Sequence, residues 1–412
     1  MSGYAFNYLT GHVTIDLVAP EQICNEGGLG EFYRDPNNPQ WGGQICRVLY
    51  HESVHFWQFL ASGYLANLVA DEYRRLVKFE TEGLVAPQSA AVSGFLERHA
   101  TFPFSPHELM ECIARYWDVH TRSPAQIIRE EDIKLSNMEL LERINPNTGV
   151  KEYSSRAFDT VMTNGPDCAL YAAPYRWMLE KASENRSPED ATYFVALTFP
   201  ILAHAAFGTP DPVGLFCNAF QRILQTDYIR AGIEEHASRN INFDWLNSWA
   251  FIVGEAVEPI ARNLGMPSYT SGFDVINRGF LRSHPLFSEY PANVLSIRGR
   301  LKMHFNTISR HQSSTAEDKA VADMALRDFY VVFGLPGQPN YRYLLGTYMA
   351  PPAIMFSNVT IYARRPAILR VQGYKPGEET YEKVFLEIQK RIRRFRAAEY
   401  AVAHGLPANA FG

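Results

Sequence analysis

The segment from residue 51 to residue 58 reads His-Glu-Ser-Val-His-Phe-Trp-Gln, which places two histidines four positions apart with a carboxylate beside the first. In an α-helix, positions i and i+4 lie on one face, so both imidazoles can reach a single cation. Glu52 lies about 100° around the helix from His51, within reach of a water molecule on that cation rather than of the cation itself. This HExxH arrangement predicts a helix with a metal site on one face and Glu52 as general base.

Apolar residues around the motif recur every three or four positions, which is the periodicity of a helix. They are Ile45, Val48, Leu49, Phe56, Phe59, Leu60, Leu65 and Leu68, and no proline follows until Pro87. The pattern predicts one long helix of about eight turns or more from Gln44 onward. We expect its metal face to carry Val48, His51, Glu52, His55, Gln58 and Ser62.

The composition is that of an ordinary globular protein, with 46% hydrophobic and 20% charged residues among 412. A net charge of −5 without a long basic run argues against nucleic acid as a partner. No apolar run is long enough to span a membrane and no secretory signal is visible, so a cytoplasmic protein is expected. The cysteines form no CxxC pair, which fits a reducing compartment and excludes a cysteine zinc site.

Helix signals dominate the rest of the chain. Ser105-Pro106, Ser123-Pro124 and Ser187-Pro188 each place serine at the N-cap and proline at the first helical position. Further helices are expected near 167–184, 212–238, 243–258, 292–310, 316–331 and 379–404, and strands at 13–18, 359–362 and 368–371. We therefore predict a mainly α fold with a small β component. A helical metal-binding domain would span 1–265, and a C-terminal helical region, 266–412, could belong to the same domain.

The motif leaves one ligand to be found, because a catalytic zinc ion usually takes three protein ligands and a water. No third histidine follows at the spacing of an extended HExxHxxGxxH motif. One candidate from another helix is Glu111. It shares a helical sector with Arg115 and Asp118, which is also the pattern of a solvated charged face.

The other candidate is Glu255, which lies in a segment, 245–257, that is apolar on almost every side. A buried carboxylate there would cost several kcal/mol without a cation beside it. Arg262, Arg230 or the metal could each provide that charge. Both glutamates therefore remain open as the third ligand.

A family resemblance rests on two patches, 51–58 and Glu111-Cys112-Ile113-Ala114-Arg115-Tyr116. The second resembles the E-G-x-A-x-Y helix that supplies a glutamate ligand in gluzincin-type members of the zincin metalloprotein superfamily, with Cys112 in place of the usual glycine. The resemblance implies a multi-helical, zincin-like fold with His51, His55 and Glu111 as metal ligands and Glu52 as catalytic base.

Three further side chains are candidates for a place at or near the site. Tyr116 could offer a phenol to stabilise an oxyanion, although an aromatic at that spacing also suits packing. His204 is interpreted as a core histidine bonded to a carbonyl, and it is next in line as a ligand. His107 precedes Glu111 by four positions and would support the site or lie on the surface.

These features favour a zinc-dependent hydrolase of peptide or amide bonds. The alternative is a non-haem iron(II) oxygenase, because two histidines and one carboxylate also form its ligand set. A second alternative is a non-enzymatic binding protein on the same scaffold. The expected partner is a peptide or small-molecule substrate, and neither its identity nor the oligomeric state follows from the sequence.

Overall fold

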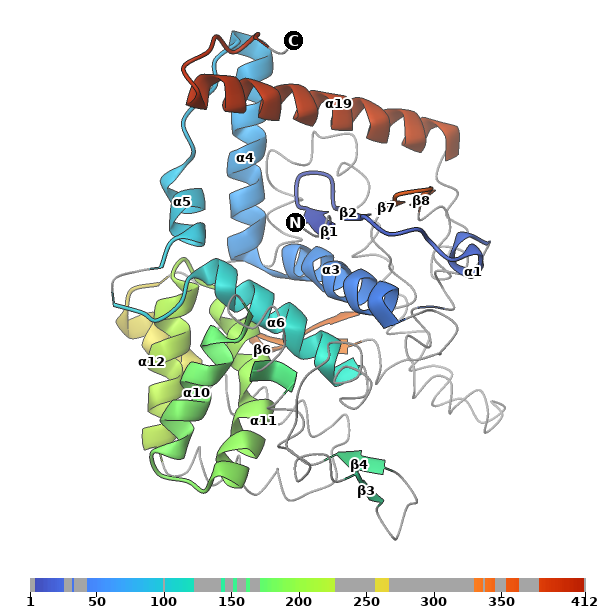
Figure 1. Cartoon of the computed structure of the whole chain (residues 1–412). Coiled ribbons are helices and arrows are strands. Elements are labelled where there is room, and N and C mark those ends of the chain that lie inside the picture. Colours follow the sequence, from blue (N-terminus) through green and yellow to red (C-terminus); the bar gives the residue numbers. More distant parts are fainter. Residues whose placement is uncertain are drawn as a thin grey trace, which may run out of the picture.

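The computed structural model is mainly helical, as predicted, with a four-stranded sheet among the described elements (Figure 1). The structure describes residues 4–25, 32, 43–98, 101–121, 142–144, 151–153, 161–163, 171–226, 256–266, 330–335, 338–344, 353–362 and 378–410. The helices expected after Ser123 and at 292–310, and the strand expected at 368–371, lie outside these residues. So does most of the helix expected at 243–258.

The long helix predicted from residue 44 onward is two helices, α3 (Gly43–Ala61) and α4 (Gly63–Glu82). Ser62 breaks it by adopting an extended backbone, with ψ at 121°, and its hydroxyl accepts a hydrogen bond from the backbone N–H of Leu65. The same hydroxyl donates to the carbonyl of Phe207, which also accepts from the N–H of Tyr64. The apolar period runs on through this junction, which explains why periodicity alone misses the break.

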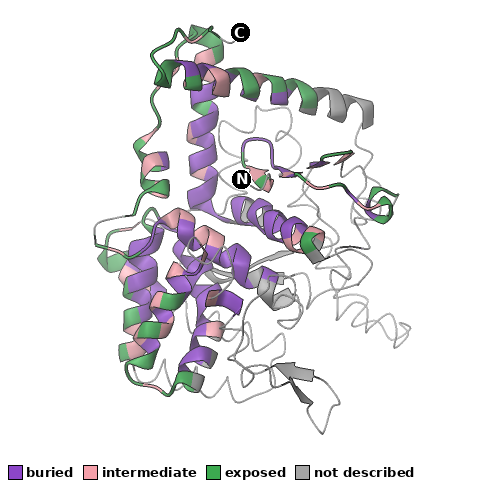
Figure 2. Cartoon of the chain, in the orientation of Figure 1, coloured by how far each residue is buried: buried purple, intermediate pink, exposed green. Residues whose placement is uncertain are grey.

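Four helices pack together around the main core: α6 (Pro106–Thr121), α10 (Ala173–Ser183), α11 (Pro188–Ala206) and α12 (Pro212–Gln225). The expected caps are present at the two described helix starts. Ser105 accepts from the N–H of Glu108, whose carboxylate accepts from the N–H of Ser105, and Ser187 accepts from the N–H of Asp190. Figure 2 shows these helices buried along the sides that face one another.

The four-stranded sheet has the order β1-β2-β7-β8 and joins residues from both ends of the chain. β1 (Tyr4–Asn7) pairs antiparallel with β2 (His12–Ile15), and β2 pairs parallel with β7 (Ala353–Phe356), which pairs antiparallel with β8 (Thr360–Tyr362). The sheet therefore crosses the boundary predicted near residue 265. The residues around that boundary lie largely outside the described ranges, and the division into two domains stays a prediction.

Smaller elements complete the described chain. They are α1 (Glu21–Cys24), α5 (Ala90–Leu96), β3 (Glu142–Ile144), β4 (Lys151–Tyr153), β5 (Tyr330–Leu335) and β6 (Gln338–Leu344). The helix predicted over 316–331 is wrong at its end, because Tyr330 and Val331 open strand β5, in a run of aromatic and β-branched residues that favours strands. None of the helices in the described ranges has both the length and the apolar character needed to cross a bilayer.

The C-terminal helix α19 (Glu378–Ala403) lies across α4, as Figure 1 shows. Ion pairs join the two helices: Arg391 meets Glu80 at 2.6 Å, and Arg396 meets the buried Glu72 at 2.9 Å. Arg75 on α4 contacts both Glu72 and Glu399, each at 2.5 Å. This network fixes α19 on α4 with the buried charges balanced.

We predict that Ser62→Ala lowers the free energy of unfolding by about 1–2 kcal/mol, because it removes the cap of α4 together with the bond to Phe207. Chemical denaturation would measure the change. Ser89→Ala is the matched control, since Ser89 caps α5 through the N–H of Val92 at a half-buried site. An equal loss of unfolding free energy in the two variants would show that the hydrogen bond to Phe207 does not stabilise the fold.

Candidate metal centre

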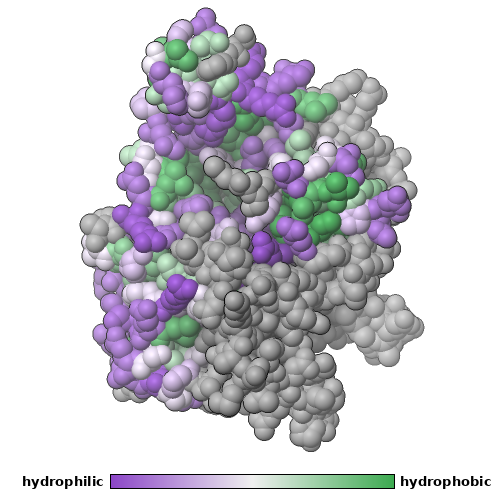
Figure 3. All heavy atoms as spheres, viewed as in Figure 1, coloured by the Kyte–Doolittle hydropathy of each residue, from purple (hydrophilic) through white to green (hydrophobic). Residues whose placement is uncertain are grey.

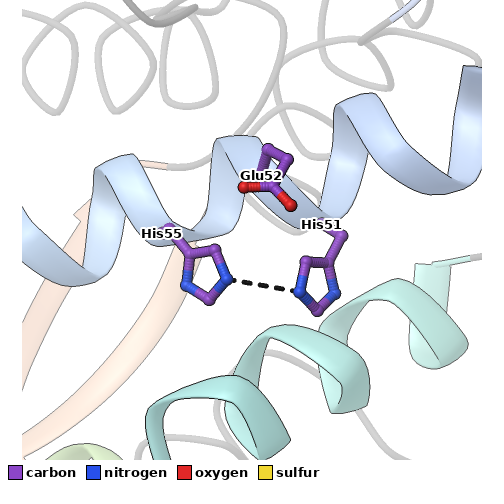
Figure 4. Close-up of side chains that lie close together, drawn as sticks. All are labelled: His51, Glu52 and His55. Carbon is purple, nitrogen blue, oxygen red and sulfur yellow. Dashed lines mark hydrogen bonds between the residues drawn. The ribbon is translucent and has the colours of Figure 1, made fainter. Parts of the chain in front are cut away.

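Helix α3 carries both motif histidines on the face that meets α6. The helix lies in contact with β1 and β2 on one side and with α6 on the other. His51 and His55 are one helical turn apart, and their Nε2 atoms lie 3.2 Å from each other. Figure 4 shows both rings pointing from α3 toward α6, with Glu52 leaving the helix between them. The three side chains form a buried cluster that could hold a metal ion.

Glu111 on α6 brings a carboxylate to the same point. Its Oε2 atom lies 3.2 Å from Nε2 of His51 and 3.3 Å from Nε2 of His55. The three atoms thus form a nearly equilateral triangle. Ligand atoms of a tetrahedral zinc site, with bonds of about 2.0–2.1 Å, lie about 3.3 Å apart. The donor set and its spacing therefore fit a metal bound by two histidines and one carboxylate.

The polar side of α6 is not a solvated charged face. Arg115 and Asp118, which share the sector of Glu111, are both buried and lie 3.3 Å apart as an ion pair. Arg115 also donates to the carbonyl of Val161. The opposite side of α6, with Leu109 and Ile113, belongs to the main core. Helix α6 is therefore covered on both sides, and the solvated interpretation of its charges is wrong.

Burial and charge act in opposite directions on Glu111 and His55. Burial by itself would raise the pKa of Glu111, but the charge of His55 and hydrogen bonds from His107, His51 and His55 hold that pKa well below its usual range. Burial would likewise lower the pKa of His55, yet the neighbouring Glu111 raises it to about 9. A proton on His55 thus balances the Glu111 carboxylate in the metal-free protein.

Glu52 has a different environment from Glu111. Burial raises its pKa above the ordinary value, although His55, His51 and a backbone hydrogen bond from Phe6 act the other way. It lines a cavity next to the histidines and is only 5% exposed. A buried carboxylate with a raised pKa, beside a cluster that fits a metal, has the properties of a general base.

Gln58 and His107 orient the cluster from outside it. The Nδ1 atom of His55 lies 2.8 Å from Oε1 of Gln58, whose amide donates to the carbonyl of Met110 on α6. A hydrogen bond at Nδ1 leaves Nε2 of His55 free to face a metal. Nε2 of His107 lies 3.4 Å from Oε1 of Glu111, the carboxylate oxygen that is not paired with the motif histidines. From the sequence, Gln58 was expected on the metal face but had no predicted role. His107 was expected either to support the site or to lie on the surface.

Of the other sequence candidates, Tyr116 and His204 lie within the described residues, and neither joins the cluster. The hydroxyl of Tyr116 donates to the carbonyl of Ala196 at 2.6 Å, and its ring packs in the main core. The structure therefore does not support a role for the Tyr116 hydroxyl in stabilising an oxyanion. His204 is buried in α11, which lowers its pKa to about 3 and fits a neutral core histidine. Glu255 lies outside the described residues, so its role as an alternative ligand stays untested.

A cavity of about 340 Å³ opens directly beside the cluster and has Glu52, His55 and Glu111 in its wall. Two aromatic residues of that wall were not anticipated from the sequence. Phe6 on β1 has its ring 6.4 Å from that of His55, and the ring of Tyr171 lies 5.5 Å from that of His51. Neither sits in a motif, and only the tertiary fold brings them to the site.

Comparisons with known proteins add no family to this geometry. A scan against protein-family models, a search of curated proteins and a search of solved structures each found no match. The resemblance to gluzincin-type zincins therefore rests on the motif residues alone and stays an expectation. The firm result is a buried His51-Glu52-His55 cluster that could hold a metal ion, with Glu111 within hydrogen-bonding distance of both histidines.

Proposed function

We propose that this protein is a metal-dependent hydrolase of peptide or amide bonds, with His51, His55 and Glu111 as metal ligands and Glu52 as general base. One observation carries the proposal: three potential ligand atoms lie 3.2–3.3 Å from one another beside a separate buried carboxylate. A bound zinc ion would lower the pKa of its water molecule and polarise a substrate carbonyl.

The protein's own residues would then carry the proton. Glu52 accepts a proton from the attacking water, and its raised pKa makes the carboxylate a stronger base than one in water. The same side chain can pass that proton to the leaving amine. Gln58 holds His55 in the orientation that presents Nε2, and His107 holds the free oxygen of Glu111, so the ligands are fixed before substrate arrives.

The alternative of an iron(II) oxygenase uses the same ligands, since two histidines and a carboxylate also suit iron. The position of Glu52 favours the hydrolase, because an oxygenase does not need a buried carboxylate base beside its metal. The metal content of protein purified without added metal would discriminate between them. Zinc supports the hydrolase, whereas iron would favour the oxygenase.

His51→Ala, His55→Ala and Glu111→Ala are each expected to abolish tight binding of one metal ion per chain, because each removes one of three ligands. Elemental analysis after dialysis would measure the metal. Glu255→Ala is the control and is expected to retain metal. Retention in Glu111→Ala together with loss in Glu255→Ala would transfer the ligand role to Glu255.

Glu52→Gln is expected to retain the metal and to lose turnover of a peptide or amide substrate by a factor of about 10² or more, because the amide cannot accept a proton. Metal content and the rate would be measured on the same sample. Glu180→Gln, at an exposed position on α10, should change neither. A metal-free Glu52→Gln variant would mean that Glu52 is a ligand and would overturn the assignment.

Metal affinity should rise with pH. The metal must displace the proton of His55, whose pKa in the metal-free protein is raised to about 9. Below that value each unit of pH should strengthen zinc binding by about tenfold. Competition with a chelator of known pH dependence, at about pH 7 and pH 8, would measure the slope. An affinity that is independent of pH would contradict a protonated His55 in the metal-free site.

A further inference from the structure

The cavity beside the metal centre has a wall whose surface is mostly apolar. Most of its residues come from β1, α3, α4, α5 and α6. About half of them have apolar side chains: Phe6, Phe59, Leu65, Leu68, Val69, Val92, Phe95, Leu96 and Met110. Four lining residues, Ala5, Tyr8, Gln88 and Leu96, are exposed, so the cavity reaches the surface. Figure 3 shows hydrophobic atoms recessed below α19 on this face. The volume of about 340 Å³ is at the lower end for small-molecule pockets.

The cavity wall follows α4 over two helical turns. Leu65, Val69 and Glu72 lie on successive turns of that helix, and all three line the wall. Seven residues of helix correspond to about 10 Å. The wall thus extends along α4 by roughly the length of an extended hydrocarbon group, and it also includes His55 and Glu111 of the metal site.

The far end of the cavity offers no unbalanced charge among the described residues. Glu72 is 1% exposed and pairs with Arg75 at 2.5 Å and with Arg396 at 2.9 Å. Both arginines also contact Glu399, so two cations meet two carboxylates. Arg396 further donates to the hydroxyl of Tyr8. A charged ligand group placed here would lose its hydration without gaining an ion pair.

We infer that the cavity binds an elongated, uncharged hydrocarbon group of the substrate, such as an aliphatic chain or an apolar side chain, with the reacting carbonyl at the His55 and Glu111 end. The inference rests on the proposed function for the position of the carbonyl. It rests on the cavity alone for the hydrocarbon group. The metal-dependent reaction would thus select neutral apolar substrates and discriminate against those with a charge at the end of the chain.

Hydroxamates with different tails are suitable probes, because the hydroxamate group chelates zinc while the tail enters the cavity. Each buried methylene strengthens binding by about fourfold. Hexanohydroxamate should therefore bind the zinc-loaded protein at least about tenfold more tightly than acetohydroxamate. The monohydroxamate of adipic acid, which has the same length but ends in a carboxylate, should lose that gain. Calorimetry would measure all three affinities.

Val69→Phe tests the location of the tail, since Val69 is buried in the cavity wall and a phenyl ring there would fill the space. It should remove most of the preference for hexanohydroxamate and leave acetohydroxamate binding unchanged. Val77→Phe is the matched control on the same helix, at a half-buried position that does not line the cavity. Val92→Phe, from α5, repeats the test should Val69→Phe fail to fold.

The corresponding amides separate this inference from the proposed function. Hexanamide should bind the metal-free protein more tightly than acetamide, as measured by ligand-detected NMR, and Val69→Phe should remove the difference. If hydroxamates bind no more tightly than amides but the tail preference persists, the metal assignment fails and the apolar pocket stands. If neither series depends on tail length, or the charged tail binds as well as the neutral one, the inference is overturned.

Discussion

Two carboxylates, the buried Glu52 and the partly buried Glu111, lie where α3 meets α6 and set the requirement that the rest of the site must meet. Glu52 and Glu111 lie in an interior where an uncompensated negative charge would cost several kcal/mol. The histidines supply the compensation, either as a protonated ring or, in our proposal, through a shared cation. Positive charge between α3 and α6 therefore stabilises their approach. The fold and the chemistry of the site depend on the same electrostatic balance.

The surrounding contacts hold the two helices in that arrangement. The amide of Gln58 links α3 to the backbone of α6 at Met110, and Ser105 and Glu108 fix the first turn of α6, one turn before Glu111. Ser62 ends α3 and ties the start of α4 to the end of α11. The contacts of Ser105, Glu108 and Ser62 satisfy backbone groups that would otherwise lack a partner at a helix end, whereas Gln58 reaches a carbonyl inside α6. Helix termini thus position a site whose reactive groups all come from helix interiors.

The sequence was sufficient for the elements with a local signature. The HExxH spacing, the capping box at Ser105 and the periodicity of residues 378–403 all depend on neighbours within one or two helical turns. The sequence was insufficient where a residue distant in the chain determines whether a side chain is buried or exposed. A charged sector formed by Glu111, Arg115 and Asp118 looks the same whether water or another helix covers it. Only tertiary packing distinguishes the two.

The same limit explains Tyr116 and the cavity wall. A tyrosine five positions after Glu111 lies about 140° further round the helix, so one residue faces α3 while the other faces the core. This angle alone argues against a place for Tyr116 at the metal site. No local sequence pattern, in contrast, identifies Phe6 or Tyr171 as site residues. These two aromatics are brought to the site by contacts between segments far apart in the chain.

The parallel pairing of β2 with β7 has a consequence for the order of folding. Strand β1, which supplies Phe6 to the site, is paired to β2, and the other edge of β2 is covered only by β7, which is synthesised after most of the chain. Contacts between such distant segments carry a high entropic cost of loop closure and form late. During synthesis, α3 and α6 can meet well before the sheet is complete. The N-terminal hairpin that lines the cavity is therefore expected to gain its support from β7 only after the helices that carry the ligand atoms have met.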